Sequence, residues 1–234
     1  MNQSRLYHGS DAGFISFSSP RINLIEEKHP DFILFSPHFT PEGLQALKDN
    51  YQEANSIPSD NVYVDIQAKC TENVETEMEG CRKFYKRLRF DVELAFPNEK
   101  KIWNQFGFND YDLARRTAKH MNVLLTDVHM VATRYKETML ANGWTEETFE
   151  TILTHKSNLK SLMDEQSQAV MERSRAAEQR GEKLNKLYEK LAVYFKAARI
   201  IYDEDEEMLQ WFKFPSKSQA KQESEEEPQT EYNN

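Results

Sequence analysis

Apolar residues recur at helical spacing along most of this chain. In the clearest run, nine small or apolar residues alternate by three and four positions: Tyr111, Ala114, Ala118, Met121, Leu125, Val128, Ala132, Tyr135 and Met139. A heptad pattern of this length is typical of a helix that packs lengthwise against a partner helix. The run stops at Asn142-Gly143, a dipeptide that commonly ends helices. We therefore predict a middle helix within residues 109–142.

A long helix precedes this middle helix. Its predicted N-cap is Thr40, followed by Pro41 at the first helical position, where the missing N–H of proline has no intrahelical partner to lose. Pro58 interrupts the apolar pattern, so we expect the helix to break there. The pattern then resumes and continues at helical spacing through Cys70 and Cys81.

A second long helix follows the middle one, with Thr145 as its predicted N-cap and a seam that runs over residues 149–201. Both ends of the seam are apolar, but its middle carries Gln166, Arg173 and Arg180. We expect the helix to bend or splay there, so that these three side chains contact water. The alternative is a binding groove or a device that selects the register of a partner helix.

Two segments, residues 39–108 and 144–214, resemble each other at an offset of about 105 residues. Each has an aromatic residue and a threonine cap, a long helix and a short aromatic tail. We interpret them as an internal repeat, although helical sequences of similar composition also mimic one another. The repeat predicts two parallel long helices with the middle helix antiparallel between them. Both aromatic tails then lie at one end of the bundle, where they cap the core or form a partner site: Trp103, Phe106, Phe108, Trp211, Phe212 and Phe214.

The two ends of the chain lack the helical pattern. Residues 1–38 mix glycines, prolines and scattered aromatic residues, so we predict an extended arm that packs on its own helices or on a neighbouring subunit. Residues 215–234 are rich in Ser, Gln and Glu, and for them we predict a disordered acidic tail. The predicted fold is therefore all-α: an elongated antiparallel bundle of long amphipathic helices over residues 39–214, with coiled-coil-like heptads.

The net charge of −9 at pH 7 is concentrated near the C-terminus. Residues 203–234 contain ten acidic residues and three lysines, so the remaining chain is close to neutral. We therefore do not expect nucleic acid as a partner. One local exception is a basic run that includes Arg82, Lys83, Lys86, Arg87 and Arg89. We interpret this run as a solvated helix face, with a patch for anionic surfaces or nucleic acid as the alternative.

No constellation in the sequence points to catalysis, a metal or a cofactor. The pattern lacks paired Glu-x-x-His motifs, a nucleophile elbow and a glycine-rich phosphate loop. Cys70 and Cys81 lie eleven positions apart on one predicted helix, too far for a disulfide. A signal-peptide pattern and an apolar run of about 20 residues are also missing, so we expect no membrane span and a cytoplasmic location.

The sequence therefore predicts a non-enzymatic helical interaction or structural protein, which associates with itself or with another protein. Long apolar stripes on few helices favour a homo-oligomer, because one copy has little surface with which to cover them. Two alternatives stay open at this point. One is a metal-binding or enzymatic bundle, and the other is a binder of anionic surfaces or nucleic acid through the basic run.

Overall fold

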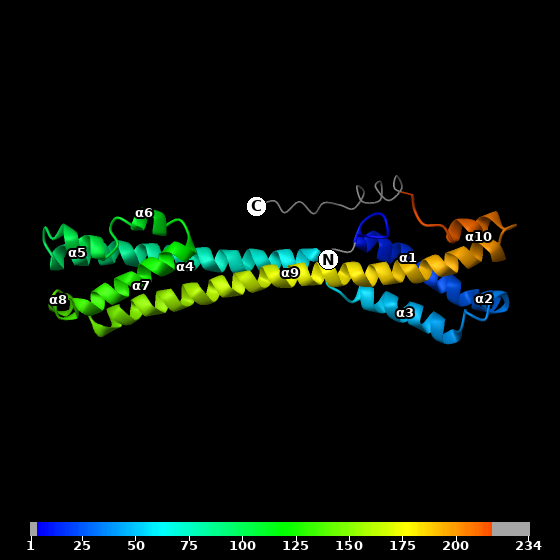
Figure 1. The fold of residues 1–234 in the computed structure, drawn as a ribbon, viewed down its shortest axis with the longest axis horizontal. Helices are drawn as coiled ribbons and strands as arrows, with labels where there is room; N and C mark the ends of the chain where they lie inside the picture. Colours follow the sequence, from blue (N-terminus) through cyan, green and yellow to red (C-terminus); the bar gives the residue numbers. More distant parts are fainter. Residues whose placement is uncertain (1–3, 217–234) are drawn as a thin grey trace. The chain divides into compact units, whose positions relative to one another are not determined.

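The computed structural model describes residues 4–216, and within this range every regular element is an α-helix (Figure 1). Long helices pack against one another, as the all-α prediction required. The chain divides into two compact units rather than one bundle. Unit 1 holds residues up to Asp60 and from Ser174 onward, and unit 2 holds Asn61–Arg173. The predicted acidic tail lies outside the described residues, apart from Pro215 and Ser216.

Unit 1 contains α1 (Asp11–Glu27), α2 (His29–Phe35), α3 (Pro41–Asn55), the second part of α9 (Glu146–Ile201) and α10 (Glu206–Trp211). Its core is rich in aromatic rings. Phe32 lies within 5.2 Å of Tyr194 and 6.1 Å of Phe212, measured between ring centroids, and it is fully buried. Residues from the first two helices therefore share one core with residues from the last two.

The prediction of an extended N-terminal arm over residues 1–38 is wrong, because most of this segment is helical. Ser10 caps α1 by accepting a hydrogen bond from the backbone N–H of Gly13 at 3.0 Å. The buried face of α1 consists of Phe14, Ser18, Ile22 and Ile25, which recur at helical spacing. Pro20 stands inside the helix, where a proline normally argues for a break, and it obscured this pattern.

The start of α3 and the interruption that follows it agree with the sequence analysis. The Thr40 hydroxyl accepts a hydrogen bond from the backbone N–H of Gly43 at 3.1 Å, and Pro41 is the first helical residue. α3 ends at Asn55, and α4 begins at Asp60, just after Pro58.

Unit 2 contains α4 (Asp60–Ala95), α5 (Lys100–Gln105), α6 (Tyr111–Ala114), α7 (Ala118–Arg134), α8 (Lys136–Ala141) and the first part of α9. Its core lies between the second half of α4, α7 and the start of α9. The buried members of α4 are Met78, Cys81, Tyr85, Leu88 and Val92. Hydrophobic contacts among three helices thus hold this unit together.

The predicted parallel arrangement of the two long helices is wrong. Glu77 contacts His155, whereas Thr71 contacts Gln166, so residue numbers rise on α9 as they fall on α4. α4 and α9 are therefore antiparallel within unit 2, as Figure 1 shows. The residues of the two predicted repeat segments are also divided between the two units. The internal repeat itself stays a prediction.

The predicted middle helix is interrupted twice. Thr117 adopts an extended conformation and caps α7, its hydroxyl accepting a hydrogen bond from the backbone N–H of His120. A second interruption falls at Tyr135, between α7 and α8, and α8 ends just before the predicted stop at Asn142. All nine apolar positions of the predicted stripe are nevertheless buried or partly buried in unit 2. The spacing identified the buried face correctly but not the turns within it.

None of the helices formed by residues 4–216 is long and apolar enough to cross a lipid bilayer.

Candidate functional site

The first half of α4 contributes no buried residue to the core of unit 2, although the partly buried Val74 packs against that core. No residue between Asn61 and Glu77 is buried, although the same helix has five buried residues between Met78 and Val92. Opposite this stretch, residues 160–173 of α9 have one buried residue, Ala169. We call residues 61–77 and 160–173 together the two-helix segment, since within unit 2 they lie beside each other (Figure 1).

The two-helix segment exposes a group of large apolar side chains. Their exposed fractions run from 38% to 53%, and the residues are Val62, Val64, Ile66, Val170 and Met171. Val62 and Ile66 are four positions apart and share one face of α4. Contacts between the two helices of the segment include polar ones: Gln166 donates to Thr71 at 3.0 Å and Arg173 donates to Gln67 at 3.3 Å. Hydrogen bonds thus stabilise the segment across its middle, while these five apolar side chains stay exposed.

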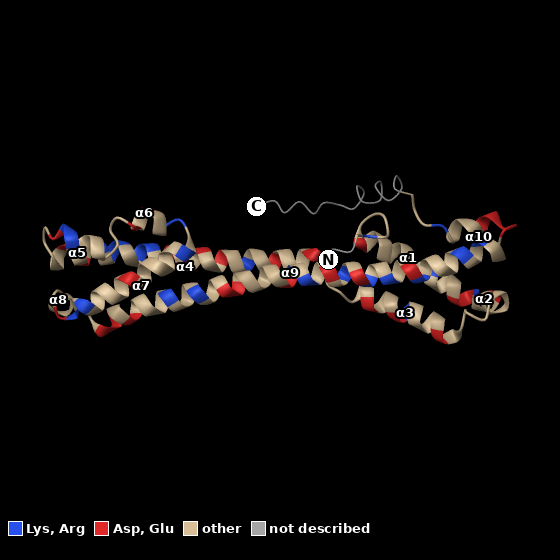
Figure 2. Ribbon diagram, viewed as in Figure 1, with Lys and Arg blue, Asp and Glu red and all other residues tan. Residues whose placement is uncertain are grey.

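The two-helix segment is acidic. It contains seven carboxylates (Asp65, Glu72, Glu75, Glu77, Asp164, Glu165 and Glu172) and three cations (Lys69, Lys160 and Arg173). Figure 2 shows residues of both signs distributed along α4 and α9. Two of the cations are paired locally, Lys69 with Glu72 and Lys160 with Asp164. Glu75 pairs with Arg82 outside the segment, and Glu77 contacts His155. The exposed carboxylates Asp65, Glu165 and Glu172 leave the segment with an excess of negative charge that salt screens.

The sequence analysis predicted that the three polar residues of the α9 seam contact water, but Arg180 is buried. Arg180 is 6% exposed, and α9 passes through its neighbour Gly181 without ending. The Arg180 guanidinium donates to the backbone oxygen of Pro58 and lies 3.8 Å from an oxygen of Asp11. Asp11 also accepts a hydrogen bond from the Tyr7 hydroxyl at 2.7 Å. Burial, reinforced by this hydrogen bond to Asp11, raises the pKa of Tyr7.

This Arg180 cluster is a structural element of unit 1. It joins the N-terminal segment, the start of α1, the loop after α3 and α9 through one buried cation. Buried charges persist when hydrogen bonds and opposite charges surround them. The seam position therefore holds elements of the same unit together.

The two predicted aromatic tails belong to separate cores and do not form one cap. Trp103 and Phe108 stack with ring centroids 5.9 Å apart in unit 2, and Phe106 is fully buried there. Phe212 and Phe214 pack in the core of unit 1. Of the six residues, Trp211 is the most exposed, at 43%. Its ring lies 5.5 Å from the Arg21 guanidinium, which donates to the Trp211 carbonyl at 3.0 Å.

The basic run on α4 is largely engaged within unit 2. Arg82 forms ion pairs with Glu75 and Glu79 and donates to the backbone oxygen of Arg115. Lys83 lies 3.8 Å from Glu79. The guanidinium of Arg89 lies 4.5 Å from the centre of the Phe108 ring. Lys86 is exposed, and Arg87 borders a pocket. These contacts favour the interpretation of the run as a solvated helix face.

The pocket beside Arg87 has a volume of about 240 Å³. It lies between α4 and the start of α9, and the Trp144 indole donates to Asp91 across it at 3.2 Å. Pockets for drug-sized ligands are larger, about 300–1,000 Å³. This pocket therefore carries no functional argument by itself.

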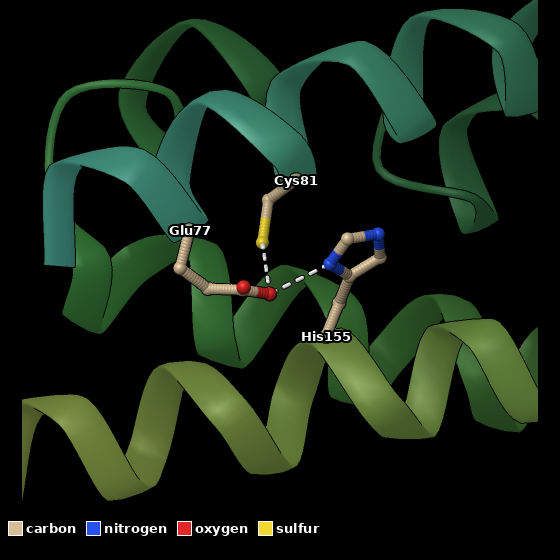
Figure 3. Close-up of side chains that lie close together, drawn as sticks. All are labelled: Glu77, Cys81 and His155. Atoms are coloured by element: carbon tan, nitrogen blue, oxygen red, sulfur yellow. Dashed lines mark hydrogen bonds and ion pairs between the residues drawn. The ribbon is translucent and has the colours of Figure 1, made fainter. Parts of the chain in front are cut away.

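A cluster that the sequence analysis missed lies at the junction of α4 and α9 in unit 2 (Figure 3). Glu77 and Cys81 stand four positions apart on α4, and His155 reaches them from α9. The His155 Nδ1 atom lies 2.7 Å from Glu77 Oε1, and the Cys81 Sγ atom lies 3.9 Å from the same oxygen. The Glu-Cys spacing is visible in the sequence, but the approach of His155, 78 residues after Glu77, is not.

Comparisons of this chain with models of protein families, with characterised proteins and with solved structures find no significant match.

Proposed function

We propose that this chain is a non-enzymatic helical interaction protein that self-associates through the two-helix segment. The observation that carries the proposal is the burial pattern of α4. Residues 61–77 include Val62, Val64 and Ile66, yet none of the 17 positions is buried. A helix with exposed apolar side chains gains stability when another helix covers them, by roughly 25 cal/mol for each Å² removed from water.

A second copy supplies a matching surface. Two antiparallel helices from each copy would form a four-helix arrangement, the number at which helices commonly enclose a core. Such an interface is related by a two-fold axis, so Val62 and Ile66 of each copy would both contribute to it. The same substitution therefore acts twice in the dimer.

The charge of the segment predicts how salt affects the association. Two acidic segments repel each other, and the repulsion weakens as the Debye length shortens from about 30 Å at 0.01 M to about 8 Å at 0.15 M salt. Self-association should therefore strengthen as ionic strength rises. A basic partner on the same surface would show the opposite dependence, because salt weakens attraction between opposite charges.

A pair of matched double variants tests the proposal. Val62→Ser with Ile66→Ser removes apolar surface from the two-helix segment. Val193→Ser with Ile200→Ser makes the same chemical change on α9 in unit 1, where these residues are 57% and 62% exposed. We expect the first variant to raise the dimer dissociation constant at least about tenfold. Light scattering during size-exclusion chromatography measures the effect.

The control variant should associate like the unchanged chain. Equal weakening by both variants would place the interface elsewhere or show that apolar surface in general drives association. An unchanged dissociation constant in the Val62/Ile66 variant would refute the role of the two-helix segment. Far-UV circular dichroism checks that each variant keeps its helices.

Binding of anionic surfaces through the basic run is a weaker candidate. Arg82 and Lys83 already contact carboxylates of their own helix, and those carboxylates reduce the local positive potential.

A further inference from the structure

Three different metal-ligating groups converge at the junction of α4 and α9 (Figure 3). The ligand atoms offered by Glu77, Cys81 and His155 all lie within 4.8 Å of one another. Cys81 is fully buried, while the side chains of Glu77 and His155 are 17% and 21% exposed. The cluster therefore has a buried inner side, formed by the thiol, and a partly open outer side through which an ion can enter.

The geometry of the helices brings these groups together. Residues four positions apart share one face of an α-helix, which places Glu77 and Cys81 side by side. Gly80 faces α9 between them, and a Cβ atom there would lie 3.3 Å from the His155 Cε1 atom. The missing side chain thus lets the imidazole approach α4 closely. The Phe84 ring, 5.3 Å from the imidazole between centroids, packs against it.

In the metal-free cluster, His155 Nδ1 makes a hydrogen bond to Glu77 Oε1 at 2.7 Å, and the Cys81 thiol donates a longer one to the same oxygen at 3.9 Å. A buried cysteine by itself is an ordinary core residue. The convergence of sulfur, nitrogen and oxygen on one point is the feature that needs an explanation.

The donor set selects the class of ion. Thiolate, imidazole and carboxylate together suit zinc and similar borderline divalent ions, whereas magnesium and calcium prefer oxygen ligands alone. With metal–ligand distances of about 2.0–2.3 Å, the ligand atoms of a tetrahedral zinc site lie roughly 3–4 Å apart. The present distances from Glu77 Oε1, 2.7 Å to His155 Nδ1 and 3.9 Å to Cys81 Sγ, are close to this range, and all three ligand atoms lie within 4.8 Å of one another. Small side-chain movements are therefore enough to form the site.

We propose that Glu77, Cys81 and His155 bind one zinc-like divalent cation that fastens α4 to α9 in unit 2. Three protein ligands leave the fourth tetrahedral position for water. On binding, the Cys81 thiol releases its proton to solvent and its sulfur binds the ion as a thiolate. In the metal-free cluster His155 donates its Nδ1 proton to the hydrogen bond with the Glu77 carboxylate. On binding, Nδ1 gives up this proton to solvent, the neutral ring carries its one proton on Nε2, and Nδ1 binds the metal. Glu77 binds as the carboxylate. Glu77 is also the last residue of the two-helix segment, but the metal proposal does not require the chain to self-associate.

Without the ion, the thiol holds its proton firmly. Burial, reinforced by the negative charge of Glu77, raises the pKa of Cys81 to about 12. A divalent cation reverses this balance because it stabilises the thiolate directly.

Titration of the reduced, metal-free full-length chain with Co²⁺ tests the proposal. We expect one equivalent of Co²⁺ to produce a thiolate-to-cobalt charge-transfer band together with the visible bands of tetrahedral cobalt. One equivalent of Zn²⁺ should then remove these bands. The chain has two cysteines in total, so each can be examined by a single substitution. Cys81→Ser should lose the charge-transfer band, whereas Cys70→Ser should keep it.

Further readouts separate binding from folding. Zn²⁺ should raise the melting temperature of the unchanged chain and of Cys70→Ser, but not that of Cys81→Ser. His155→Gln should keep its helices by circular dichroism and bind Co²⁺ at least about tenfold more weakly. The proposal is overturned if no charge-transfer band appears at one equivalent, or if the band depends on Cys70 rather than on Cys81.

Discussion

At the scale of single residues, the buried cation Arg180 is the most informative position. Its side chain is 8% exposed, and its partners are the backbone oxygen of Pro58 and the carboxylate of Asp11. The heptad frame identified Arg180 as a seam residue but not its environment. Pro58 precedes it by 122 positions, and a periodic pattern carries no information about contacts over such a separation.

Replacing Arg180 with Met should destabilise the chain by about 2 kcal/mol, because the Pro58 carbonyl loses its donor and Asp11 loses a cation. The loss is moderate because Asp11 keeps Arg5 at 2.9 Å and Tyr7 at 2.7 Å. Urea unfolding followed by far-UV circular dichroism measures it. Arg175→Met, at an exposed position on the same helix, is the matched control and should change stability by less than about 0.5 kcal/mol. Equal effects of the two substitutions would show that the buried contacts contribute nothing measurable.

The Glu77, Cys81 and His155 cluster shows the same limit of sequence reasoning. A search for Glu-x-x-His motifs could not find it, because its histidine comes from another helix. The spacing of Glu77 and Cys81 is one local signal, and it is shared by many helices that bind no metal. Only the antiparallel contact of α4 with α9 brings the third group into place.

At the scale of elements, caps and breaks were predictable where residue chemistry is local. Thr40 and Pro41 marked the start of α3, and Pro58 marked the interruption before α4. Helix α1 was missed because Pro20 and Gly13 suggested a break, whereas the Ser10 cap and the packing of Phe14 outweigh them. Tertiary burial of an apolar face commonly overrides weak helix propensity.

The cap at Thr117 offers a test of the break that the sequence did not reveal. Its hydroxyl accepts from the backbone N–H of His120, one of the N–H groups at the start of α7 that lack an intrahelical partner. Thr117→Ala should therefore cost about 1 kcal/mol of unfolding free energy. Thr133→Ala serves as the control, since Thr133 is exposed within α7 and its hydroxyl donates to the His129 carbonyl.

Thermal unfolding compares the melting temperatures of the two variants with that of the unchanged chain. We expect Thr117→Ala to have the lower melting temperature and Thr133→Ala to melt close to the unchanged chain. A reversed order would mean that α7 begins without help from this side chain.

At the scale of the whole molecule, the sequence predicted the helical class but not the division into two units. The apolar stripes identify which helix face is buried: seven of the nine positions from Tyr111 to Met139 are buried, and Ala118 and Tyr135 are partly buried. They do not specify the polarity of the partner helix, because parallel and antiparallel neighbours bury the same stripe. The predicted repeat gave the wrong polarity for α4 and α9, and it joined aromatic tails that belong to separate cores.

The central claim is that the chain self-associates, since none of residues 61–77 of α4 is buried in unit 2. Sedimentation equilibrium of the full-length chain, over a range of protein concentrations and at two ionic strengths, tests it most directly. We predict an average mass that rises with protein concentration from 27.5 kDa to twice that value. At the higher ionic strength, this rise should occur at a lower protein concentration. A mass of 27.5 kDa at every concentration and both ionic strengths would contradict the claim.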